Sequence, residues 1–532
     1  MRDTNAAPKS ILLILLFASM LLHFLTGYAQ HPNVLVGGRI SSNESEEPSI
    51  VINRLNTNLI LVGTNIDNYY YSTDGGENWT HGVLTSSYGV WGDPCVIADT
   101  TGNYYFFHLS NPATGSWIDR IVCQKLDSLG GEWSDGTFTG LNGEKAQDKE
   151  WAAVDWQNNN IYTTWTQFDQ YGSISRNHYS NIMFSRSTDG AQTWSKAIRI
   201  NEVSGDCRDD DNTVEGAVPA IGPGGEIYVS WAGPEGIVFD KSTDYGETWL
   251  PHDIFVTDNP GGWVIEIPGI YRCNGMPVTA CDVSNGPYRG YIYINWADQR
   301  NGANDTDIWL KKSTDGGQTW SEPKRINDDP PDKQQFFTWM TIDQSNGYIY
   351  IVFYDRRNYN DTNTDVYLAV SKDGAETFAN FKISESPFIA ESDIFIGDYT
   401  NISAHNNVIR PVWARLDNSD LSIWTALINP DLLTTVKNTP ATVQPENFEI
   451  ISIHPNPFNA STLIRYRLPK TGKVVLKVYD VLGQEITTIF SGNQIQGAHQ
   501  ILWNAEKIAN GVYFIHLEFG NALKTKRVVL SK

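Results

Sequence analysis

The sequence STDGGENW at residues 72–79 recurs along the chain and decides the fold. Its shared pattern is Ser-x-Asp-x-Gly-x-x-Trp, with Phe378 replacing Trp in the last full copy and a degenerate copy at residues 127–133. In this pattern the aspartate can bond the amides that follow it, the glycine permits a positive φ, and the aromatic ring holds the turn against a sheet. We therefore expect a hairpin turn at each copy and a structural role for its aspartate, namely for Asp74, Asp189, Asp244, Asp315 and Asp373.

A second repeat lies upstream of these turns. It consists of an apolar strand, a turn rich in Gly, Asn or Asp, and a strand that ends in an aromatic residue, as at residues 161–165. Small antiparallel sheets that recur every 40 to 65 residues or so predict an all-β chain folded as a β-propeller. Seven units favour seven blades, with six still possible; the units begin at Pro48, Pro94, Trp151, Gly216, Pro277, Trp339 and Tyr399.

The Ser-x-Asp-x-Gly-x-x-Trp copies resemble the Asp-box, or bacterial neuraminidase repeat, of sialidases. The resemblance implies a propeller whose Asp-boxes are structural turns at the blade periphery, and it implies little about chemistry. Because the sialidases have six blades, seven units mean either that one unit is not a full blade or that this propeller is related but distinct.

Composition and charge narrow the function. The chain has 532 residues and a formal net charge of −22, which makes binding to nucleic acid improbable. Residues 1–29 have the basic start, apolar run and small residues of a secretory signal peptide, with a membrane anchor as the alternative. No later stretch is apolar enough to span a membrane. Five cysteines allow at most two internal disulfides, and Cys273 and Cys281 are close enough in sequence to pair.

The sign of the charge changes near the C-terminus. Residues 451–532 hold 10 Lys or Arg against 4 Asp or Glu, a net of +6, whereas residues 1–450 hold 29 against 57, a net of −28. This change predicts a propeller at 30–435, a linker at 436–450 and a separate domain at 451–532, whose alternating strands are typical of a small β-sandwich.

The C-terminal segment resembles the sorting domain of type IX secretion cargo. The resemblance rests on the PNPFN start at 455–459, YDVLG at 479–483, GVY at 511–513 and the basic end KTKR at 524–527. It implies a partner in the type IX secretion machinery, export across the outer membrane, and release or attachment at the cell surface. The alternative is a β-sandwich that only binds a ligand.

Two sets of charged residues point to a site. An acid stands directly before the first strand of five units, and an arginine follows the second strand of three consecutive units. Because the two strands run antiparallel, both sets are expected at one end of the central channel. The acids are Glu47, Asp93, Glu150, Glu215 and Asp398, and the arginines are Arg300, Arg357 and Arg415.

Sialidases hold a sugar carboxylate with three arginines and cleave with an acid and a Tyr-Glu pair. By resemblance, Arg300, Arg357 and Arg415 are candidates for the carboxylate grip, the acids are candidates for the proton donor, and Tyr354 is the most suggestive tyrosine. The alternative is that each arginine bonds a nearby aspartate and closes the ring. The family's first arginine motif has only a faint echo at residues 38–41, so no catalytic role is transferred to a particular position.

The sequence predicts no required cofactor. The acid rim could instead collect Ca²⁺, as could the acidic stretches at 208–212 and 304–307, although solvated acidic loops are the favoured interpretation of those stretches. Two functions follow. One is a secreted, sialidase-like propeller that acts on anionic glycans, in its enzyme form an exo-glycosidase of the α-sialidase type. The other is a non-catalytic propeller that binds a glycan or a protein.

Overall fold

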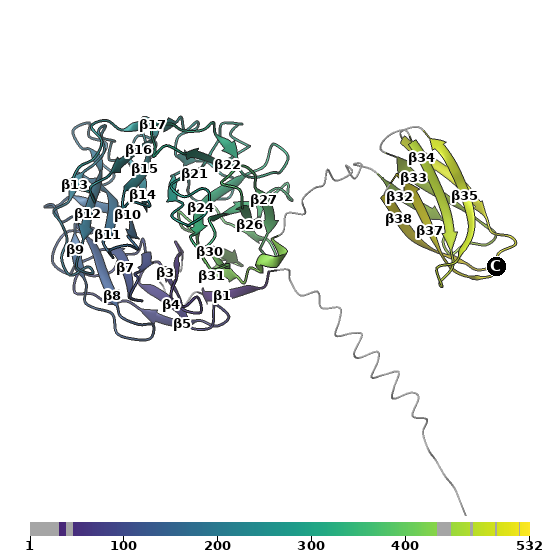
Figure 1. Cartoon of the computed structure of the whole chain (residues 1–532), viewed down its shortest axis with the longest axis horizontal. Helices are drawn as coiled ribbons and strands as arrows, with labels where there is room; N and C mark the ends of the chain where they lie inside the picture. The colour runs from purple at the N-terminus through teal and green to yellow at the C-terminus, as the bar shows by residue number, and fades with distance from the viewer. Residues whose placement is uncertain (1–30, 39–45, 434–447, 469–471, 495–496, 521) are drawn as a thin grey trace, which may run out of the picture. The chain divides into compact units, whose positions relative to one another are not determined.

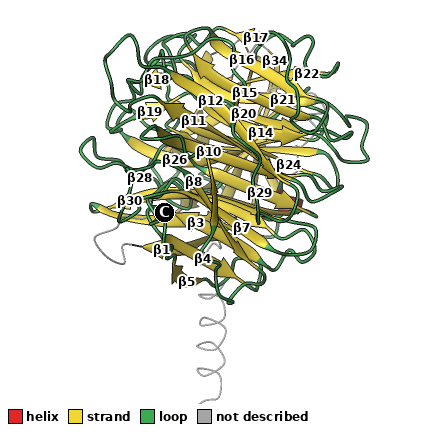
Figure 2. Ribbon diagram, turned by 90° about the vertical axis from the view of Figure 1, so that its left-hand side faces the viewer, coloured by secondary structure: helices red, strands yellow, loops and turns green. Residues whose placement is uncertain are grey.

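The computed structural model describes residues 31–38, 46–433, 448–468, 472–494, 497–520 and 522–532. The chain divides into two compact units between Leu433 and Thr434. The predicted signal peptide and most of the predicted linker lie outside the described residues. Figure 2 shows that the described part is strand and loop almost throughout, with one short 3₁₀ turn at Pro430–Leu432. Within that part, no helix combines the length and the apolar character needed to cross a membrane.

The first unit is a seven-bladed β-propeller, which confirms the predicted fold. Seven four-stranded antiparallel sheets surround one axis (Figure 1). The inner strands are β2 (Ser49–Ile52), β6 (Cys95–Ala98), β10 (Ala146–Val154), β14 (Glu215–Ile221), β20 (Val278–Cys281), β24 (Gln335–Asp343) and β29 (Asn401–His405). The second strands are β3 (Ile60–Thr64), β7 (Tyr104–Leu109), β11 (Ile161–Phe168), β15 (Ile227–Gly233), β21 (Ile292–Asp298), β25 (Tyr348–Asp355) and β30 (Val408–Asp417).

Two further strands complete each blade. The third strands are β4 (Asn68–Ser72), β8 (Ile121–Leu126), β12 (Ser180–Ser187), β16 (Gly236–Ser242), β22 (Asp307–Ser313), β26 (Asn363–Ser371) and β31 (Asp420–Ala426). The outer strands are β5 (Thr80–Val83), β9 (Thr137–Thr139), β13 (Ile198–Arg199), β17 (Ile254–Thr257), β23 (Lys324–Arg325), β27 (Ala379–Lys382) and β1 (Asn33–Gly38). Outside this pattern, β28 (Phe388–Ile389) pairs with β26, and β18 (Val264–Ile265) pairs with β19 (Cys273–Asn274).

The ring is closed by both ends of the propeller segment. Each inner strand contacts the inner strand of the next blade, and β29 contacts β2. The last blade takes its outer strand from the start of the chain, because β1 pairs with β31 in the register Asn33↔Ala426. Ring closure removes the exposed sheet edges that an open array would leave.

Near-continuous burial of the second strands explains their apolar sequence. All eight residues of β11 are buried, and Trp165, Trp231, Trp296 and Trp413 of four such strands are at most 1% exposed. A blade packs against a neighbour on each face, so its strands are buried on both sides and lose the alternation of a half-exposed sheet. The aromatic residues that end the repeat therefore form the core between the blades.

The Asp-box turns connect the third and outer strands of five blades. In the first, the Ser72 hydroxyl donates to Asp74 Oδ1 at 2.8 Å and accepts from the Gly76 amide at 2.8 Å. The Asn78 amide donates to the same aspartate at 3.0 Å. Hydrogen bonds of this kind lower the pKa of Asp74 to about 2, with the Asn78 side chain as the largest cause. The box is a self-contained turn, as its sequence predicts.

The box tryptophans pack against the preceding blade. Trp249 meets Phe184 edge to face with ring centroids 5.0 Å apart, and Trp320 meets Phe239 in the same way at 5.2 Å. Each box therefore joins two blades, a contact that the sequence pattern alone places only against a sheet.

The second unit is a β-sandwich of two antiparallel sheets. One holds β32 (Glu449–His454), β33 (Ser461–Leu468) and β36 (Gly497–Asn504), and the other holds β35 (Glu485–Gln494), β34 (Gly472–Tyr479), β37 (Gly511–Phe519) and β38 (Ala522–Leu530). Burial alternates along β33 and β37, because one face of each sheet packs on the core and the other faces solvent.

Candidate functional site at the mouth of the propeller

The five sequence-predicted acids lie where the inner strands begin, at the end of the channel that we call the mouth. A lysine that the sequence reasoning missed, Lys149, stands among them. Its ammonium nitrogen lies 2.9 Å from Asp93 Oδ2, 2.9 Å from Asp398 Oδ2 and 3.8 Å from Glu47 Oε1. Lys149 is 7% exposed, so this is a buried ion cluster contributed by four blades.

A second missed cation joins the cluster from the loop between β18 and β19. The Arg272 guanidinium binds both oxygens of Asp398 and reaches Asp209 Oδ2 at 3.4 Å. Asp209 in turn accepts a hydrogen bond from the Tyr171 hydroxyl at 2.7 Å. The Arg272 side chain is 39% exposed and is the cluster's most open group. It comes from an insertion with no counterpart in the other blades, so the repeat pattern held no signal for it.

The backbone turns sharply where the acids stand. Glu47, Asp93 and Lys149 have φ between +52° and +53°, a region that residues other than glycine rarely adopt. In β10 the pairing register shifts between Asp148 and Trp151, which marks a β-bulge. Such bulges re-aim side chains, and backbone strain of this kind concentrates at functional sites. The same features recur at Gly216 in β14 and at Phe337 in β24, so they belong to the blade repeat at the mouth.

Two of the predicted acids are buried without a hydrogen-bond donor. Both carboxyl oxygens of Glu150 and of Glu215 are inaccessible and have no donor among the described residues. Burial raises the pKa of both groups well above the usual range, helped by Asp93 for Glu150 and by Asp209 for Glu215. Because neither side chain is more than 1% exposed, neither can touch a ligand in this conformation.

The remaining acids fall into two groups, one with raised and one with lowered pKa values. Burial, followed by the charge of Asp93, raises the pKa of Glu47 well above its usual range, and burial does the same for Asp148. Burial also opposes the ionisation of Asp398, but Lys149 and Arg272 overcome it and lower the pKa of Asp398 to about 2. The cluster is therefore a set of ion pairs surrounded by protonated carboxyls.

Three aromatic side chains close the channel beneath the charged cluster. The rings of Trp151 and Trp339 lie 4.3 Å apart between centroids, and Tyr399 contacts both at 5.0 and 6.0 Å. The same three rings line a small pocket together with Lys149 and Asp398, so aromatic and charged groups lie side by side there.

A ridge of aromatic rings crosses the rim of the mouth. Trp91 and Trp117 are 39% and 44% exposed with centroids 6.0 Å apart, and Trp117 meets Tyr171 at 5.6 Å. Tyr171 bonds Asp209, which in turn pairs with Arg272. The Arg272 guanidinium lies 5.0 Å from the centroid of the Phe395 ring. The Phe395 centroid lies 6.0 Å from that of Tyr271, which is 59% exposed. These contacts are continuous from Trp91 to Tyr271, and we name this set the aromatic ridge. A cleft of about 1030 Å³ lies beside it, lined by Tyr271, Arg272, Asp210, Asp211 and Gln299 among others.

The three predicted arginines pair locally with aspartates and do not join the ion cluster, and the carboxylate grip stays a prediction. Each bonds a carboxylate two positions away in sequence: Arg300 with Asp298, Arg357 with Asp355 and Arg415 with Asp417. Residues at this spacing share one face of a strand, so the nearest partner is local. The predicted alternative, an arginine paired with a nearby aspartate, describes these contacts.

Tyr354 is likewise structural. It is 1% exposed, and its hydroxyl donates to the Ala414 carbonyl of the next blade at 2.6 Å. It therefore links two blades and lies outside any open site in this structure.

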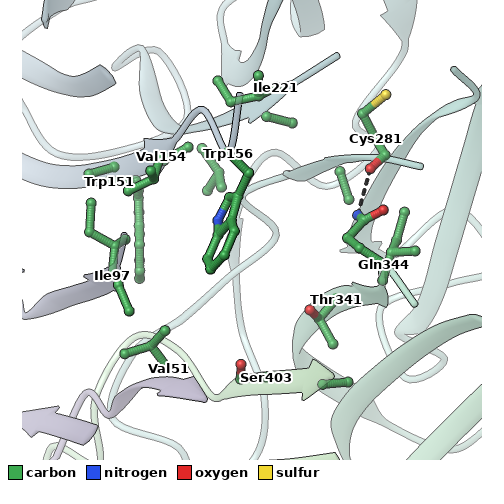
Figure 3. Close-up of a pocket in the computed structure, with 18 of the residues that line it drawn as sticks. Val51, Ile97, Trp151, Val154, Trp156, Ile221, Cys281, Thr341, Gln344 and Ser403 are labelled. Atoms are coloured by element: carbon green, nitrogen blue, oxygen red, sulfur yellow. Dashed lines mark hydrogen bonds between the residues drawn. The ribbon is translucent and has the colours of Figure 1, made fainter. Parts of the chain in front are cut away.

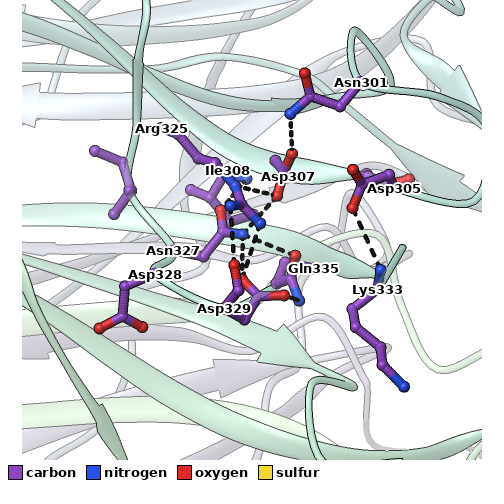
Figure 4. A network of polar contacts seen from close by, with 12 residues as sticks. Asn301, Asp305, Asp307, Ile308, Arg325, Asn327, Asp328, Asp329, Lys333 and Gln335 are labelled. Carbon is purple, nitrogen blue, oxygen red and sulfur yellow. Dashed lines mark hydrogen bonds and ion pairs between the residues drawn. The ribbon is translucent and has the colours of Figure 1, made fainter. Parts of the chain in front are cut away.

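The acidic stretch at 304–307 forms an internal network (Figure 4). Asp307 Oδ1 accepts from Arg325 Nε and from Asn327 Nδ2, both at 2.6 Å, and Asp329 Oδ1 accepts from the same two side chains. Asp305 accepts from the Lys333 amide at 3.3 Å. Among the described residues, no group of three or more His, Cys, Asp or Glu side chains is placed to hold a metal ion. Binding of Ca²⁺ stays a prediction.

The five cysteines are buried free thiols. Cys273 and Cys281, close in sequence, lie in β19 and at the end of β20 without a bond between them. Burial raises the pKa of both thiols, so the thiolate is disfavoured and these side chains act as small core residues.

Comparison with known proteins identifies the second unit. Residues 452–531 match the family model of the secretion system C-terminal sorting domain. The match confirms the predicted sorting domain, and with it a protein that is secreted or held at the outer cell surface. Fold and tail together define a seven-bladed β-propeller exported through its C-terminal domain. No curated protein matches the chain by sequence.

Solved structures similar to the chain include several glycan-active enzymes. An ulvan lyase bound to a GlcA-Rha3S glycan has a TM-score of 0.45 and 11% identity, covering 74% of this chain and 95% of its own. The NanB sialidase of Streptococcus pneumoniae has a TM-score of 0.42 and 8% identity, covering 78% and 97%. The sialidase of Trypanosoma rangeli has a TM-score of 0.40 and 9% identity, covering 94% and 89%. At these values the similarities carry no information about the ligand or reaction of this chain.

Proposed function

We propose that the protein is a secreted glycan-binding propeller that holds an anionic glycan chain along the aromatic ridge. The observation that carries this proposal is the aromatic ridge, in which the exposed rings of Trp91, Trp117 and Tyr271 belong to two ring groups joined by Asp209 and Arg272. Exposed aromatic residues that gather on one face mark a ligand surface, and their flat apolar faces suit the C–H faces of sugar rings.

Arg272 supports an acidic sugar as the preferred ligand. It is the ridge's one cation among the described residues, and its guanidinium stays 39% exposed although it binds Asp398 and Asp209. A planar guanidinium matches a carboxylate or sulfate with two hydrogen bonds. The neighbouring carboxylates limit this attraction to one anionic group close to Arg272, because a second negative charge would approach Asp209 or Asp93.

A specific observation also favours an exo-glycosidase as a second candidate. Glu47, whose pKa is raised, is hydrogen-bonded to Asp93, whose pKa is lowered. The Asp93 side chain is 11% exposed, which makes it the most exposed of the five predicted acids. A carboxyl that holds a proton beside an ionised carboxylate is the arrangement that acid and base catalysis needs. Asp93 is thus the proposed catalytic carboxylate, and Glu47 its proton source.

The binding test uses the secreted full-length protein and a panel of neutral, uronate, sialylated and sulfated oligosaccharides. We expect saturable binding of at least one acidic glycan, weakened about tenfold by Trp117→Ala and by Tyr271→Ala, a loss of about 1.4 kcal/mol. Phe255→Ala is the matched control, because Phe255 is 56% exposed on the outer strand β17, away from the ridge. Unchanged binding in both ridge variants would contradict the proposal.

The enzyme candidate has its own test. Hydrolysis of fluorogenic glycosides that Asp93→Asn abolishes, while glycan binding persists, would establish the glycosidase. Binding without turnover of any glycoside leaves the binding function alone.

A further inference from the structure

The opposite end of the central channel holds a second, separate cavity. It measures about 440 Å³ and is lined by the inner strands of all seven blades. Figure 3 shows Val51, Ile97, Ile221, Thr341 and Ser403 around the open space, with the Trp156 side chain projecting into it. Small-molecule sites typically have volumes of about 300 to 1,000 Å³. We name this space the basal cavity.

The inner end of the basal cavity is lined by Trp151 and Trp339, and Tyr399 packs against both rings. Its opening lies among the turns that link the inner to the second strands, where the exposed Gln157 donates to the Pro223 carbonyl of the next blade at 2.8 Å. A ligand of the basal cavity would therefore bind independently of a glycan on the aromatic ridge.

The cavity wall is apolar towards a ligand. Three of its polar side-chain atoms accept hydrogen bonds from inner-strand amides of the next blade: Ser49 Oγ from Val96 at 3.1 Å, Ser403 Oγ from Ile52 at 3.1 Å, and Cys95 Sγ from Ala152 at 3.3 Å. The remaining wall is mainly Val, Ile and Ala. Such a wall favours a hydrocarbon or aromatic body over a sugar, whose hydroxyls would lack partners there.

The charge at the entrance is positive. The lining includes the side chains of Arg54, Arg289 and Asp155. Asp155 is 1% exposed and is engaged by its own turn, with Oδ1 accepting from the Gln157 amide at 2.8 Å and Oδ2 from Asn158 Nδ2 at 2.7 Å. It therefore has little capacity left to repel or bind a ligand.

Arg54 is the unused group of the entrance. Its guanidinium stacks on Trp156, 4.4 Å from the ring centroid, and no described residue accepts a hydrogen bond from it. Burial lowers the pKa of Arg54 to about 10 against the opposing charge of Asp343, so the group stays charged at neutral pH. Asp343 is itself satisfied by the Ser345 hydroxyl and by the amides of Asn406 and Asn407. A half-buried guanidinium that stacks on Trp156 therefore lines the cavity entrance.

We propose that the basal cavity binds a small carboxylate with an apolar or aromatic body. The carboxylate pairs with Arg54 at the entrance, and the body fills the space between the inner strands beside Trp156. Two observations carry the proposal: a cavity of small-molecule size whose lining side chains are mainly Val, Ile and Ala, and a guanidinium at its opening that stacks on Trp156. The ligand class differs from the glycan proposed for the mouth.

The test uses the full secreted protein and two probes. The first is 8-anilinonaphthalene-1-sulfonate, whose fluorescence reports an anion with an apolar body; the second is 3-phenylpropionate as competitor, with 3-phenylpropanol as its neutral analogue. We expect one saturable probe site, displaced by 3-phenylpropionate and at least about tenfold less well by the alcohol. Arg54→Gln should abolish this preference, and Ala153→Phe, which fills the cavity, should abolish binding.

Arg208→Gln is the matched control, because this arginine is 52% exposed and lies outside the cavity lining. Circular dichroism and the urea midpoint confirm that each variant folds. The proposal is overturned by the absence of a saturable site, by equal competition from the acid and the alcohol, or by binding that folded Arg54→Gln and Ala153→Phe leave unchanged. Glycan binding at the ridge, measured in the same variants, is expected to persist, so the two proposals fail separately.

Discussion

Carboxyl side chains have opposite environments at the two ends of the propeller. At the outer turns, the Asp-box aspartates accept several hydrogen bonds, and the pKa of Asp244 is lowered to about 2, chiefly by the Thr248 side chain. At the mouth, burial raises the pKa of Glu150 and Glu215, which have no donors among the described residues. A carboxylate that accepts hydrogen bonds from its own turn stabilises that turn. A carboxyl that is buried without a donor resists ionisation, so the stability linked to its proton is lost as pH rises.

The sharpest way to break this comparison is to remove the cation of the mouth. Lys149→Met removes the positive charge that Asp93 and Asp398 share. Asp398 keeps its ion pair with Arg272, whereas Asp93 is left buried without this cation. We expect a loss of about 3 to 5 kcal/mol in the free energy of unfolding, the cost of breaking a buried ion pair. Urea unfolding measures it, with Lys196→Met, at an exposed position, as control. A loss below 1 kcal/mol or so would mean that the cluster is hydrated and open.

Arg357, one of the three arginines that pair locally with an aspartate, provides the second test. Arg357→Gln removes the partner of Asp355, whose side chain is fully buried and whose pKa burial raises to about 6. We expect a loss of about 2 to 3 kcal/mol in stability and unchanged glycan binding. The exposed Arg208 provides the control variant Arg208→Gln. If glycan binding fell in a folded Arg357→Gln protein, Arg357 would have to contact the ligand.

A pH titration sharpens the contrast between the two ends. Because the pKa of Glu215 is raised in the folded state by burial and by Asp209, its contribution to stability is full below the unfolded pKa and is lost as pH rises through the folded pKa. We expect the urea midpoint of the wild type to fall as pH rises above the unfolded pKa of Glu215, and to fall less in Glu215→Gln. Glu235→Gln, at an exposed site, should follow the wild type. Equal falls in the wild type and Glu215→Gln would show that Glu215 is ionised when folded.

The smallest effect is expected at an Asp-box. Asp244→Asn keeps the shape of the side chain but weakens its bonds from Thr248 and Ser242, so we expect a loss of about 1 kcal/mol at neutral pH. With a folded pKa of about 2, the aspartate contributes above its unfolded pKa and loses its contribution as pH falls towards 2. The variant and the wild type should therefore converge in acid. Asp127→Asn, in the degenerate copy where the side chain is 85% exposed, is the control.

The regular parts of the molecule were predictable because each is written in a short stretch of sequence. The Asp-box signals its turn, and the seven strand pairs signal the seven blades. The acids were found because a strand start is visible in sequence. Lys149 and Arg272 were not, since one was hidden between two acids and the other lies in a loop that occurs once. The ridge escaped for a similar reason: its rings come from loops of unlike length whose meeting depends on ring closure.

The structure shows local partners for the three arginines, and their role as a carboxylate grip stays a prediction. A sequence pattern shows that Asp298 and Arg300 are two positions apart, but it does not say whether the guanidinium turns back to that aspartate or out to a ligand. The desolvation cost of leaving a buried aspartate unpaired decides the matter, because the local partner needs no additional ordering.

The strand β1 gives the chain an order of events. Asn33 pairs with Ala426, so the ring stays an open arc until the last blade has been synthesised, and this long-range pairing is expected to be slow. The sorting domain at 452–531 is made only after that. A chain cut short anywhere within the blades therefore lacks its closing partner and its export tag together. Because the sorting domain follows all seven blades, only a chain in which every blade has been translated carries it.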